Sequence, residues 1–256
     1  MPQRPETLPL LTPDTALFLD FDGTLVTLAS QPELVEVPPG LTSVLAALYA
    51  RLNGALALVS GRALRDLDAF LAPLLLPMAG EHGAQLRNAD GRLLSTPPVD
   101  LRAALQAAES LVGRHPALIL ERKNLALSLH YRQAPELEQL CLQTMREALA
   151  SSAGIELMQG KCVIDLKPAG VSKGTAIAAF MSEATFAGRR PIFAGDDVTD
   201  EAGFEQVQQL GGIAIKVGPE PTRAQFRCAS VAQLGEWLME SAGMARPEPG
   251  IRGLSA

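Results

Sequence analysis

Short apolar runs alternate with amphipathic segments at both ends of the chain. Apolar runs with little or no interruption predict buried strands, and these runs occupy residues 16–19, 55–59, 75–79, 191–194 and 212–217. Helical spacing of apolar residues predicts helices, at residues 39–52, 63–71, 172–183, 200–210 and 231–240. Buried strands joined by helices are typical of a parallel sheet covered on both faces. We therefore predict an α/β core assembled from the two ends of the chain.

The middle of the chain follows a different pattern. Two helical stretches, residues 105–112 and 134–150, are each followed by two strands that a short turn connects, which indicates hairpins. The strands lie at residues 117–122 and 125–132, split by Lys123-Asn124, and at residues 154–160 and 162–168, joined at Gly160-Lys161. The order αββαββ predicts an α+β unit with a four-stranded antiparallel sheet. We expect residues 1–97 and 170–256 to form the core and residues 98–169 to be an insertion into it.

Polar residues follow three of the predicted core strands. Asp20 ends the first strand, and Asp22 lies two residues further on, so both side chains point to the same side in extended geometry. Other strands are followed by Ser60 and by Asp196, Asp197 and Asp200. Ligands of open parallel sheets bind at the carboxyl ends of the strands. Because clustered carboxylates repel each other, they favour a hard divalent cation such as Mg²⁺, which also bridges phosphate oxygens.

Each of these signals is weak by itself. A lone Asp-x-Asp or Asp-Asp pair more often caps a helix or lies in a solvated turn, and a lone lysine such as Lys173 is usually solvent-exposed. Their joint occurrence at the strand ends of one sheet is a stronger signal. The sequence contains neither the GxxxxGK[ST] spacing nor a GxGxxG after the first strand, which argues against a P-loop and a dinucleotide site.

Composition narrows the class of protein. The 256 residues are 47% hydrophobic, which is ample for a sizeable core, and the net charge is −6. An acidic chain is a poor candidate for binding nucleic acid or an anionic membrane. Three cysteines without CxxC spacing fit a reducing cytosol. With no signal peptide at the N-terminus and no apolar run long enough to cross a bilayer, we expect a cytoplasmic protein.

Four short motifs occur in a fixed order along the chain: DFDGTL, SGR, SKG and GDDVTDE. In this order they resemble the motifs of the haloacid dehalogenase-like (HAD) superfamily of phosphotransferases. Longer stretches, GEHGA, LERKNLALSLHYR, QGKCVIDLKP and SKGTAIAAFM, resemble the trehalose-6-phosphate phosphatases within it. The resemblance implies a Rossmann-like parallel-sheet core with an inserted α+β cap domain. One departure is Asp165, where the family usually has Glu: the shorter side chain keeps the charge but retracts it by one methylene group from the sugar.

The resemblance also implies roles for the core residues. Asp20 would attack phosphorus and form an aspartyl phosphate. Asp22 would protonate the leaving oxygen and then activate water. The phosphate would be bound by Ser60, Gly61 and Lys173. Mg²⁺ would be held by Asp20, the backbone carbonyl of Asp22 and Asp196, supported by Asp197 and Asp200.

The inserted unit would act as a cap that closes over the core and excludes water. Glu121 and Lys123 share one face of a strand, and Lys161 and Asp165 share a face of the second hairpin. A face with two acids and two lysines suits a polyhydroxylated sugar, although an ordinary solvated face with ion pairs is the alternative. Arg62 and His82 would face the same cleft. His130 and Arg132 stay open between a structural role and a place in the cleft.

These observations favour a small-molecule sugar phosphate as substrate and a Mg²⁺-dependent trehalose-6-phosphate phosphatase as the activity. Another sugar-phosphate phosphatase with the same cap, for mannosyl-phosphoglycerate or sucrose phosphate, is the nearest alternative, and only the cap residues separate the two. A signalling module that carries a phospho-aspartate is disfavoured, because Asp22 would shorten the lifetime of that group. A haloalkanoate dehalogenase would need neither Asp22 nor Mg²⁺. The sequence does not indicate the oligomeric state.

Overall fold

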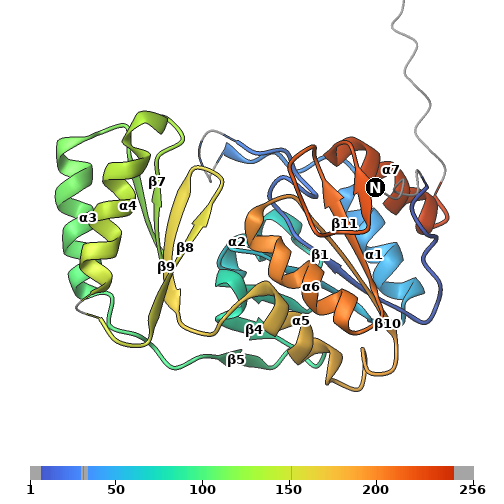
Figure 1. Cartoon of the computed structure of the whole chain (residues 1–256). Coiled ribbons are helices and arrows are strands. Elements are labelled where there is room, and N and C mark those ends of the chain that lie inside the picture. The colour runs from blue at the N-terminus through green and yellow to red at the C-terminus, as the bar shows by residue number, and fades with distance from the viewer. Residues whose placement is uncertain (1–6, 30, 32–33, 151, 245–256) are drawn as a thin grey trace, which may run out of the picture.

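Two sheets divide the chain into a core and a cap (Figure 1). The computed structural model describes residues 7–29, 31, 34–150 and 152–244, so the outermost parts of the predicted core, residues 1–6 and 245–256, lie outside the described residues. The core sheet has eight strands in the order β12-β11-β10-β1-β2-β3-β4-β5. Their bounds are Thr15–Leu19 (β1), Leu56–Val59 (β2), Met78–Gly80 (β3), Gln85–Arg87 (β4), Leu93–Ser95 (β5), Arg190–Gly195 (β10), Ile213–Val217 (β11) and Phe226–Cys228 (β12).

The strands from β12 to β3 pair in parallel, which confirms the predicted core, but β4 and β5 add an antiparallel hairpin at one edge. The sequence pattern did not indicate β4, β5 or β12, because each has three residues and β5 is exposed throughout. The third core strand was expected at residues 75–79 and instead begins at Met78. Leu75 is 67% exposed, so this part of the apolar run lies outside the sheet.

Helices cover the core sheet (Figure 1). Two of them, α5 (Lys173–Met181) and α6 (Glu201–Gln209), pack against each other, and α6 also packs on β10 and β11. The helices α1 (Leu41–Arg51) and α7 (Val231–Ser241) form a second pair. Helix α2 (Leu64–Leu71) contacts β3. All five were predicted from the spacing of apolar residues. None of the helices within the described ranges has the length and apolar character that crossing a bilayer requires.

The cap has the predicted αββαββ order. Its elements are α3 (Arg102–Arg114), β6 (Ile119–Arg122), β7 (Leu127–His130), α4 (Glu138–Leu149), β8 (Ile155–Gly160) and β9 (Val163–Pro168). The sheet order is β6-β7-β9-β8 and every pairing is antiparallel. Helices α3 and α4 pack together on the outer face of this sheet, so that its other face is turned toward the core (Figure 1).

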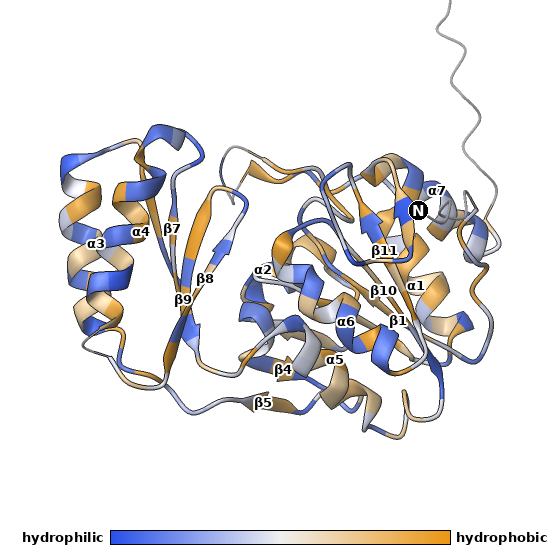
Figure 2. Ribbon diagram, in the orientation of Figure 1, coloured by the Kyte–Doolittle hydropathy of each residue, from blue (hydrophilic) through white to orange (hydrophobic). Residues whose placement is uncertain are grey.

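Core and cap have separate hydrophobic interiors. One cluster of buried side chains belongs to the core, and another belongs to the cap sheet and its helices. Figure 2 shows hydrophobic residues along the strands of both sheets. A third, small cluster consists of Ala84, Leu125 and Val171. Leu125 belongs to the β6–β7 turn of the cap, whereas Ala84 and Val171 belong to the core and to the segment that returns to it. This small cluster therefore joins the two parts of the chain.

Strand register brings the polar residues of the core together. Leu19 at the end of β1 pairs with Ala194 of β10 and with Leu58 of β2. The residues that follow these three strands thus emerge side by side at the carboxyl edge of the sheet. Two short 3-10 turns border the same edge, η2 (Glu81–Gly83) after β3 and η4 (Val198–Asp200) after β10.

Candidate active site

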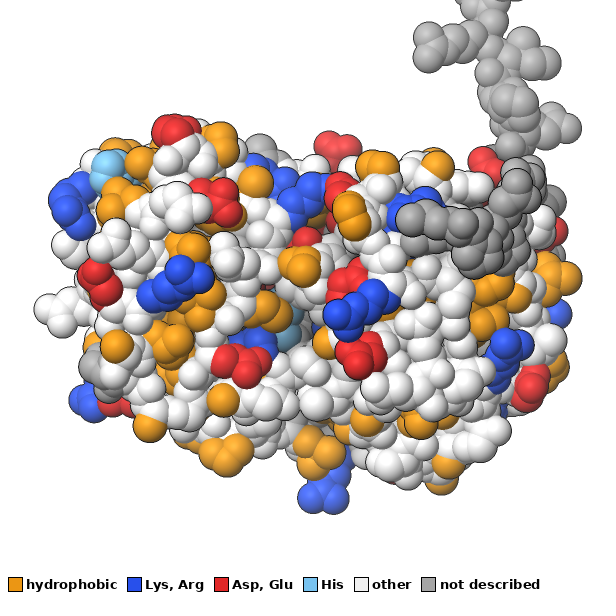
Figure 3. Space-filling view, viewed as in Figure 1, with side chains coloured by type: hydrophobic (Ala, Val, Ile, Leu, Met, Phe, Trp, Pro, Cys, Tyr) orange, Lys and Arg blue, Asp and Glu red, His pale blue; other side chains and the backbone are white. Residues whose placement is uncertain are grey.

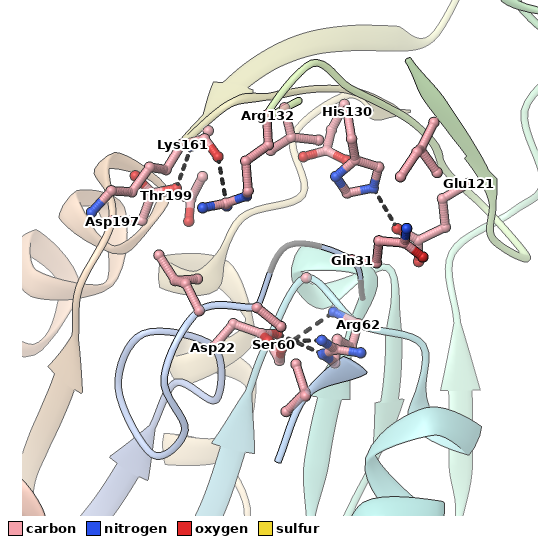
Figure 4. Close-up of a pocket in the computed structure, with 18 of the residues that line it drawn as sticks. Asp22, Gln31, Ser60, Arg62, Glu121, His130, Arg132, Lys161, Asp197 and Thr199 are labelled. Carbon is pink, nitrogen blue, oxygen red and sulfur yellow. Dashed lines mark hydrogen bonds and ion pairs between the residues drawn. The ribbon is translucent and has the colours of Figure 1, made fainter. Parts of the chain in front are cut away.

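A cavity of about 150 Å³ lies between the carboxyl edge of the core sheet and the cap. In the space-filling view, side chains of both charges gather along the hollow between the two lobes (Figure 3). The close-up shows Glu121, His130 and Arg132 of the cap above Asp22, Ser60 and Arg62 of the core, with Asp197 and Thr199 of the core beside Lys161 of the cap (Figure 4). The predicted site residues that line it are Asp20, Asp22, Ser60, Gly61, Arg62, His82, Glu121, Lys123, Lys161, Asp165, Lys173, Asp196 and Asp197. Asp200, the fourteenth predicted residue, is fully buried beneath the cavity floor.

Asp20 forms the floor of the cavity with Lys173. The Lys173 Nζ lies 2.7 Å from Asp20 Oδ1 and 2.6 Å from Asp200 Oδ1. Lys173 is the first residue of α5, and the Ser172 side chain caps this helix, which fixes where the lysine enters the site. Burial opposes a charged ammonium, but Asp20 and Asp200 outweigh it and raise the pKa of Lys173. The lysine therefore remains a cation beside Asp20, where a phosphate would bring further negative charge.

Three carboxylates form the candidate metal centre. Asp20, Asp196 and Asp200 each present an oxygen, and these atoms lie within 4.8 Å of one another. Burial raises the pKa of Asp196 to about 7, assisted by Asp200, and burial also raises the pKa of Asp20 well above its ordinary value, although Lys173 opposes it. The carboxylates of this centre are therefore costly to ionise without a further cation. Oxygen ligands without nitrogen or sulfur fit Mg²⁺.

Asp200 contacts its two acidic neighbours and also belongs to the acidic cluster. The sequence suggested a supporting role next to Asp197, and the Asp200 carboxylate does accept the backbone N–H groups of Asp196 and Asp197, at 3.0 and 2.9 Å. Its other oxygen accepts a hydrogen bond from Lys173 Nζ at 2.6 Å, and one oxygen of Asp200 lies within 4.8 Å of oxygens of Asp20 and Asp196. Gly23 closes the opposite side of Asp196: it has φ +76°, and a Cβ there would lie 2.1 Å from Asp196 Oδ2. The turn after Asp22 must therefore be glycine.

Asp22 is engaged by Arg62. The guanidinium makes two hydrogen bonds to its carboxylate, of 2.6 and 2.8 Å. The same guanidinium carbon lies 5.0 Å from the Phe70 ring centroid and 5.9 Å from that of Phe21, within cation–π range. The Arg62 backbone N–H donates to Ser60 Oγ at 3.2 Å. Arg62 thus links the side chain of Asp22 to the loop that follows β2 (Figure 4).

Gly61 and His82 are in close contact behind this loop. A Cβ on Gly61 would lie 2.6 Å from His82 Cε1, so only glycine fits. His82 has φ +61° and is 5% exposed. Its Nε2 lies 3.4 Å from Asp165 Oδ2, an ion-pair distance without hydrogen-bond geometry, and no other described residue offers either ring nitrogen a hydrogen bond. His82 therefore lies where the core meets the cap.

The cap contributes a buried network of charged side chains. Asp165 is 2% exposed, accepts a hydrogen bond from Ser128 Oγ and lies 3.6 Å from Lys123 Nζ. Burial opposes ionisation of Asp165, but Lys123 and His82 together hold the pKa of its carboxyl well below the usual range. Lys123 Nζ also lies 3.9 Å from Glu121, which is 2.8 Å from His130 Nε2. Asp165 is thus occupied by protein partners, in keeping with its retracted position.

The second hairpin of the cap contacts the core through Lys161. Its backbone N–H donates to Asp197 Oδ2 at 3.0 Å (Figure 4). Its Nζ lies 3.0 Å from Glu220. Arg132 donates to the Lys161 carbonyl at 3.1 Å. His130 and Arg132 line the cavity and also bind Glu121 and the Lys161 carbonyl, so each has a place in the cleft and a contact within the cap. Sequence reasoning missed further polar lining residues, Gln31, Gln133 and Thr199, because none belongs to a motif that signals chemistry.

Comparison with known proteins agrees with this geometry. The model of the Trehalose-phosphatase family matches residues 18–232. The chain is 41% identical over 232 residues to the trehalose-6-phosphate phosphatase of Escherichia coli (strain K12), covering 90% of this chain and 87% of the relative. It is 44% identical over 210 residues to a probable trehalose-phosphate phosphatase of Sinorhizobium fredii (strain NBRC 101917 / NGR234), covering 80% and 78%.

The fold agrees as well. The C-terminal domain of a trehalose-6-phosphate phosphatase from C. albicans matches with a TM-score of 0.80, over 90% of this chain and 92% of that chain. At 21% identity this likeness shows the fold alone, and it confirms the expected α/β core with an inserted cap. The family match and the two sequence relatives extend across both parts of the chain. The chain therefore belongs to the trehalose-phosphatase family.

Proposed function

We propose that the protein hydrolyses trehalose 6-phosphate to trehalose and inorganic phosphate. The observation that carries the proposal is that Asp20 and Lys173 of the core line the same cavity as Glu121 and Lys123 of the cap. The first pair suits phosphoryl transfer, and the second suits the hydroxyl groups of a sugar. The relatives named as trehalose-6-phosphate phosphatases support the same substrate.

The reaction follows from the two carboxylates at the end of β1. Asp20 attacks phosphorus, the bond from phosphorus to the sugar oxygen breaks, and that oxygen takes a proton from Asp22. The Asp22 carboxylate then takes a proton from water, whose oxygen attacks the aspartyl phosphate, releases inorganic phosphate and restores Asp20. Because Arg62 occupies both oxygens of Asp22 in this structure, the pair must separate before Asp22 delivers a proton. An incoming phosphate dianion is a natural competitor for the guanidinium.

Phosphate binding is assigned to Ser60, Gly61 and Lys173. Ser60 is 1% exposed and lies at the carboxyl end of β2, and its hydroxyl is turned to the Arg62 loop. Gly61 leaves the backbone free to approach the phosphate closely. Lys173 balances the charge that accumulates on Asp20 and the phosphoryl oxygens.

A Mg²⁺ ion would be held by Asp20, the backbone carbonyl of Asp22 and Asp196, with Asp197 and Asp200 in support. The convergence of the Asp20, Asp196 and Asp200 oxygens supports this assignment. When bound, the ion supplies positive charge to the phosphoryl oxygens. The Asp200 carboxylate accepts a hydrogen bond from the backbone N–H of Asp196 and so keeps this part of the backbone in place.

Sugar recognition is assigned to Arg62, His82, Glu121, Lys123, Lys161 and Asp165. Among these, Glu121 of β6 and Lys123 line the cavity from the cap, although Lys123 directly follows β6 and does not share the strand with Glu121 as expected. Burial disfavours the charged form of Glu121, but His130 and Lys123 outweigh it and lower the pKa of this carboxyl, so it accepts hydrogen bonds as an anion. Asp165 contributes through Lys123 and His82, its neighbours at 3.6 and 3.4 Å.

The division into a core of residues 1–97 and 170–256 and a cap of residues 98–169 belongs to the same proposal. The separate hydrophobic clusters of the two sheets support it. A cytoplasmic location is compatible with three free thiols, those of Cys141, Cys162 and Cys228.

A phosphate-release assay over a panel of sugar phosphates tests the proposal. Trehalose 6-phosphate should be preferred over sucrose phosphate, mannosyl-phosphoglycerate and a small aryl phosphate, with Mg²⁺ present. Preference for one of the other sugar phosphates would assign the cap to that sugar. Absence of release from every phosphate ester would overturn the phosphatase function itself.

A further inference from the structure

Glu81 is a fully buried acid that the mechanism above does not use. It lies in the η2 turn after β3, with 0% exposure and φ +50°. Its two carboxylate oxygens accept the backbone N–H groups of Asn124 and Leu125, at 2.9 and 2.6 Å. Among the described residues no lysine, arginine or histidine lies within ion-pair distance of it. Burying a charged carboxylate costs free energy of folding unless hydrogen bonds compensate for it. The two backbone donors from the cap provide this compensation, and their position suggests a role for Glu81.

The backbone of Glu81 is tied to the phosphate side of the cavity. Its N–H donates to the Arg62 carbonyl at 2.9 Å, and the N–H of His82 donates to the Ser60 carbonyl at 2.9 Å. The η2 turn is therefore held against the loop of residues 60–62 by two hydrogen bonds. Because the positive φ angles of Glu81 and His82 are unfavourable in isolation, these contacts also keep the turn in its shape.

The side chain of Glu81 is tied to the sugar side. The two amides that it binds belong to the β6–β7 turn, directly after Lys123. The Lys123 N–H is itself bonded to the Ala126 carbonyl at 3.0 Å, so the turn moves as a unit. Leu125 is buried against Ala84 and Val171 beside this contact, which shields it from water.

We propose that Glu81 is a positioning residue that sets the spacing between the phosphate-binding loop and Lys123. One side of the η2 turn contacts the loop that holds Ser60 and Arg62, and the other contacts the cap turn that places Lys123 over the cavity. A disaccharide phosphate contacts the phosphate-binding loop and Lys123 at the same time, so the distance between them matters for its binding. A small aryl phosphate contacts only the phosphate-binding loop. The proposal rests on the proposed function, since it assigns the sugar end to Lys123.

The substitution Glu81→Gln tests this role. The amide preserves the shape, but its NH₂ group cannot accept a hydrogen bond, so one of the two turn amides loses its partner. We expect kcat/KM for trehalose 6-phosphate to fall by about tenfold or more, mostly through KM. Aryl phosphate hydrolysis should stay within about twofold. Asn124→Ala is the matched control, because it removes only the exposed side-chain contact of the same turn to Gln85 and should change neither substrate by more than about twofold.

A double-mutant cycle shows whether Glu81 acts through Lys123. In a Lys123→Ala background, Glu81→Gln should cost little more than about twofold, because the group that it positions is gone. If the double variant instead loses activity by the product of the two single-variant losses, the two residues act independently and the proposal is overturned. Equal losses on both substrates, including complete loss through misfolding, would also overturn it, because Glu81 would then support the core as a whole.

Hydrogen exchange of the wild-type protein gives a measurement that needs no variant. The Asn124 and Leu125 amides should be protected in the substrate-free enzyme, and exchange at the rate of an exposed turn would overturn the proposal. The wild type is also the reference for the function: if it does not release phosphate from trehalose 6-phosphate, the proposed function fails. If the wild type does so and Glu81→Gln matches it on that substrate, only the role of Glu81 fails.

Discussion

The substitution Asp196→Asn should make the metal-free protein more stable. Asp196 is 8% exposed, and burial next to Asp200 raises the pKa of its carboxyl from 3.8 to about 7. Between these values the folded state binds the proton more tightly than the unfolded state, so the wild type loses stability as the pH rises. At about 1.36 kcal/mol per pH unit, the cost approaches about 4 kcal/mol above pH 7. Asparagine cannot ionise and avoids this cost.

Urea unfolding in a chelator measures the difference. Trp237, the one tryptophan of the chain, is 7% exposed in α7 and reports on the core through its fluorescence. The advantage of Asp196→Asn should grow from about 1 kcal/mol near pH 4.5 to about 4 kcal/mol near pH 8. The matched control is Asp90→Asn, which changes an exposed acid and should alter the stability by less than about 0.5 kcal/mol at either pH.

Added Mg²⁺ should reduce the difference in the free energy of unfolding between Asp196→Asn and the wild type at pH 8. A ligand that binds only the folded state contributes about 2.7 kcal/mol at one hundred times its Kd, and the wild type should gain more of it than Asp196→Asn. An asparagine variant that is less stable than the wild type at pH 8 in chelator would refute the reasoning. A stability difference that does not depend on pH would refute the reasoning as well, because it would then not come from ionisation of Asp196.

Three further substitutions probe the core of the site. Asp20→Asn should abolish phosphate release from both sugar and aryl phosphates, since an amide does not attack phosphorus, and clear residual release from a pure preparation would remove Asp20 from this role. Lys173→Met should destabilise the protein by about 3–5 kcal/mol in urea unfolding at neutral pH, because Asp20 and Asp200 lose a cation at 2.7 and 2.6 Å; unchanged stability would show that other groups compensate. Arg62→Lys should lower kcat/KM by about tenfold or more, because the incoming phosphate takes Arg62 over from Asp22 and lysine cannot bind a phosphate through two parallel hydrogen bonds; full activity would mean that a positive charge suffices.

The polar core residues could be predicted because they follow buried strands. A short apolar run such as residues 16–19 has few alternatives to a central strand, and parallel strands end at the same edge of a sheet. The proximity of Asp20 and Asp196 follows from that rule, and the register of β1 with β10 bears it out. The cap was equally accessible, since its hairpins have clear turns and the αββ order occurs twice.

Other features depend on contacts that no local pattern records. The pair of Arg62 with Asp22 joins residues 40 positions apart, and its aromatic neighbour Phe70 follows from how α2 packs. Glu81 belongs to the stretch GEHGA, which carries the family resemblance but assigns no role to this acid. Nothing in the stretch indicates that the Glu81 carboxylate binds backbone amides 43 and 44 residues away. Three-residue strands such as β5 escape detection because they are too short to show a period.

Two turns of the cap bind carboxylates of the core: the β6–β7 turn binds Glu81, and the β8–β9 turn binds Asp197. These two contacts differ in their access to water, and this difference indicates on which side the cavity opens. We expect substrate to enter between core and cap, which requires one of these two contacts to separate. Glu81 is fully buried beside Leu125, and separating it from its amides would leave polar groups unpaired until water arrives. On the other side, Lys161 and Glu220 are each 44% exposed, and such ion pairs contribute at most about 1 kcal/mol. Water replaces the bonds of Lys161 to Asp197 and Glu220 at little cost. We therefore expect opening on that side, which would leave Glu81 in contact with the turn after Lys123 and would preserve the spacing between the phosphate loop and this lysine.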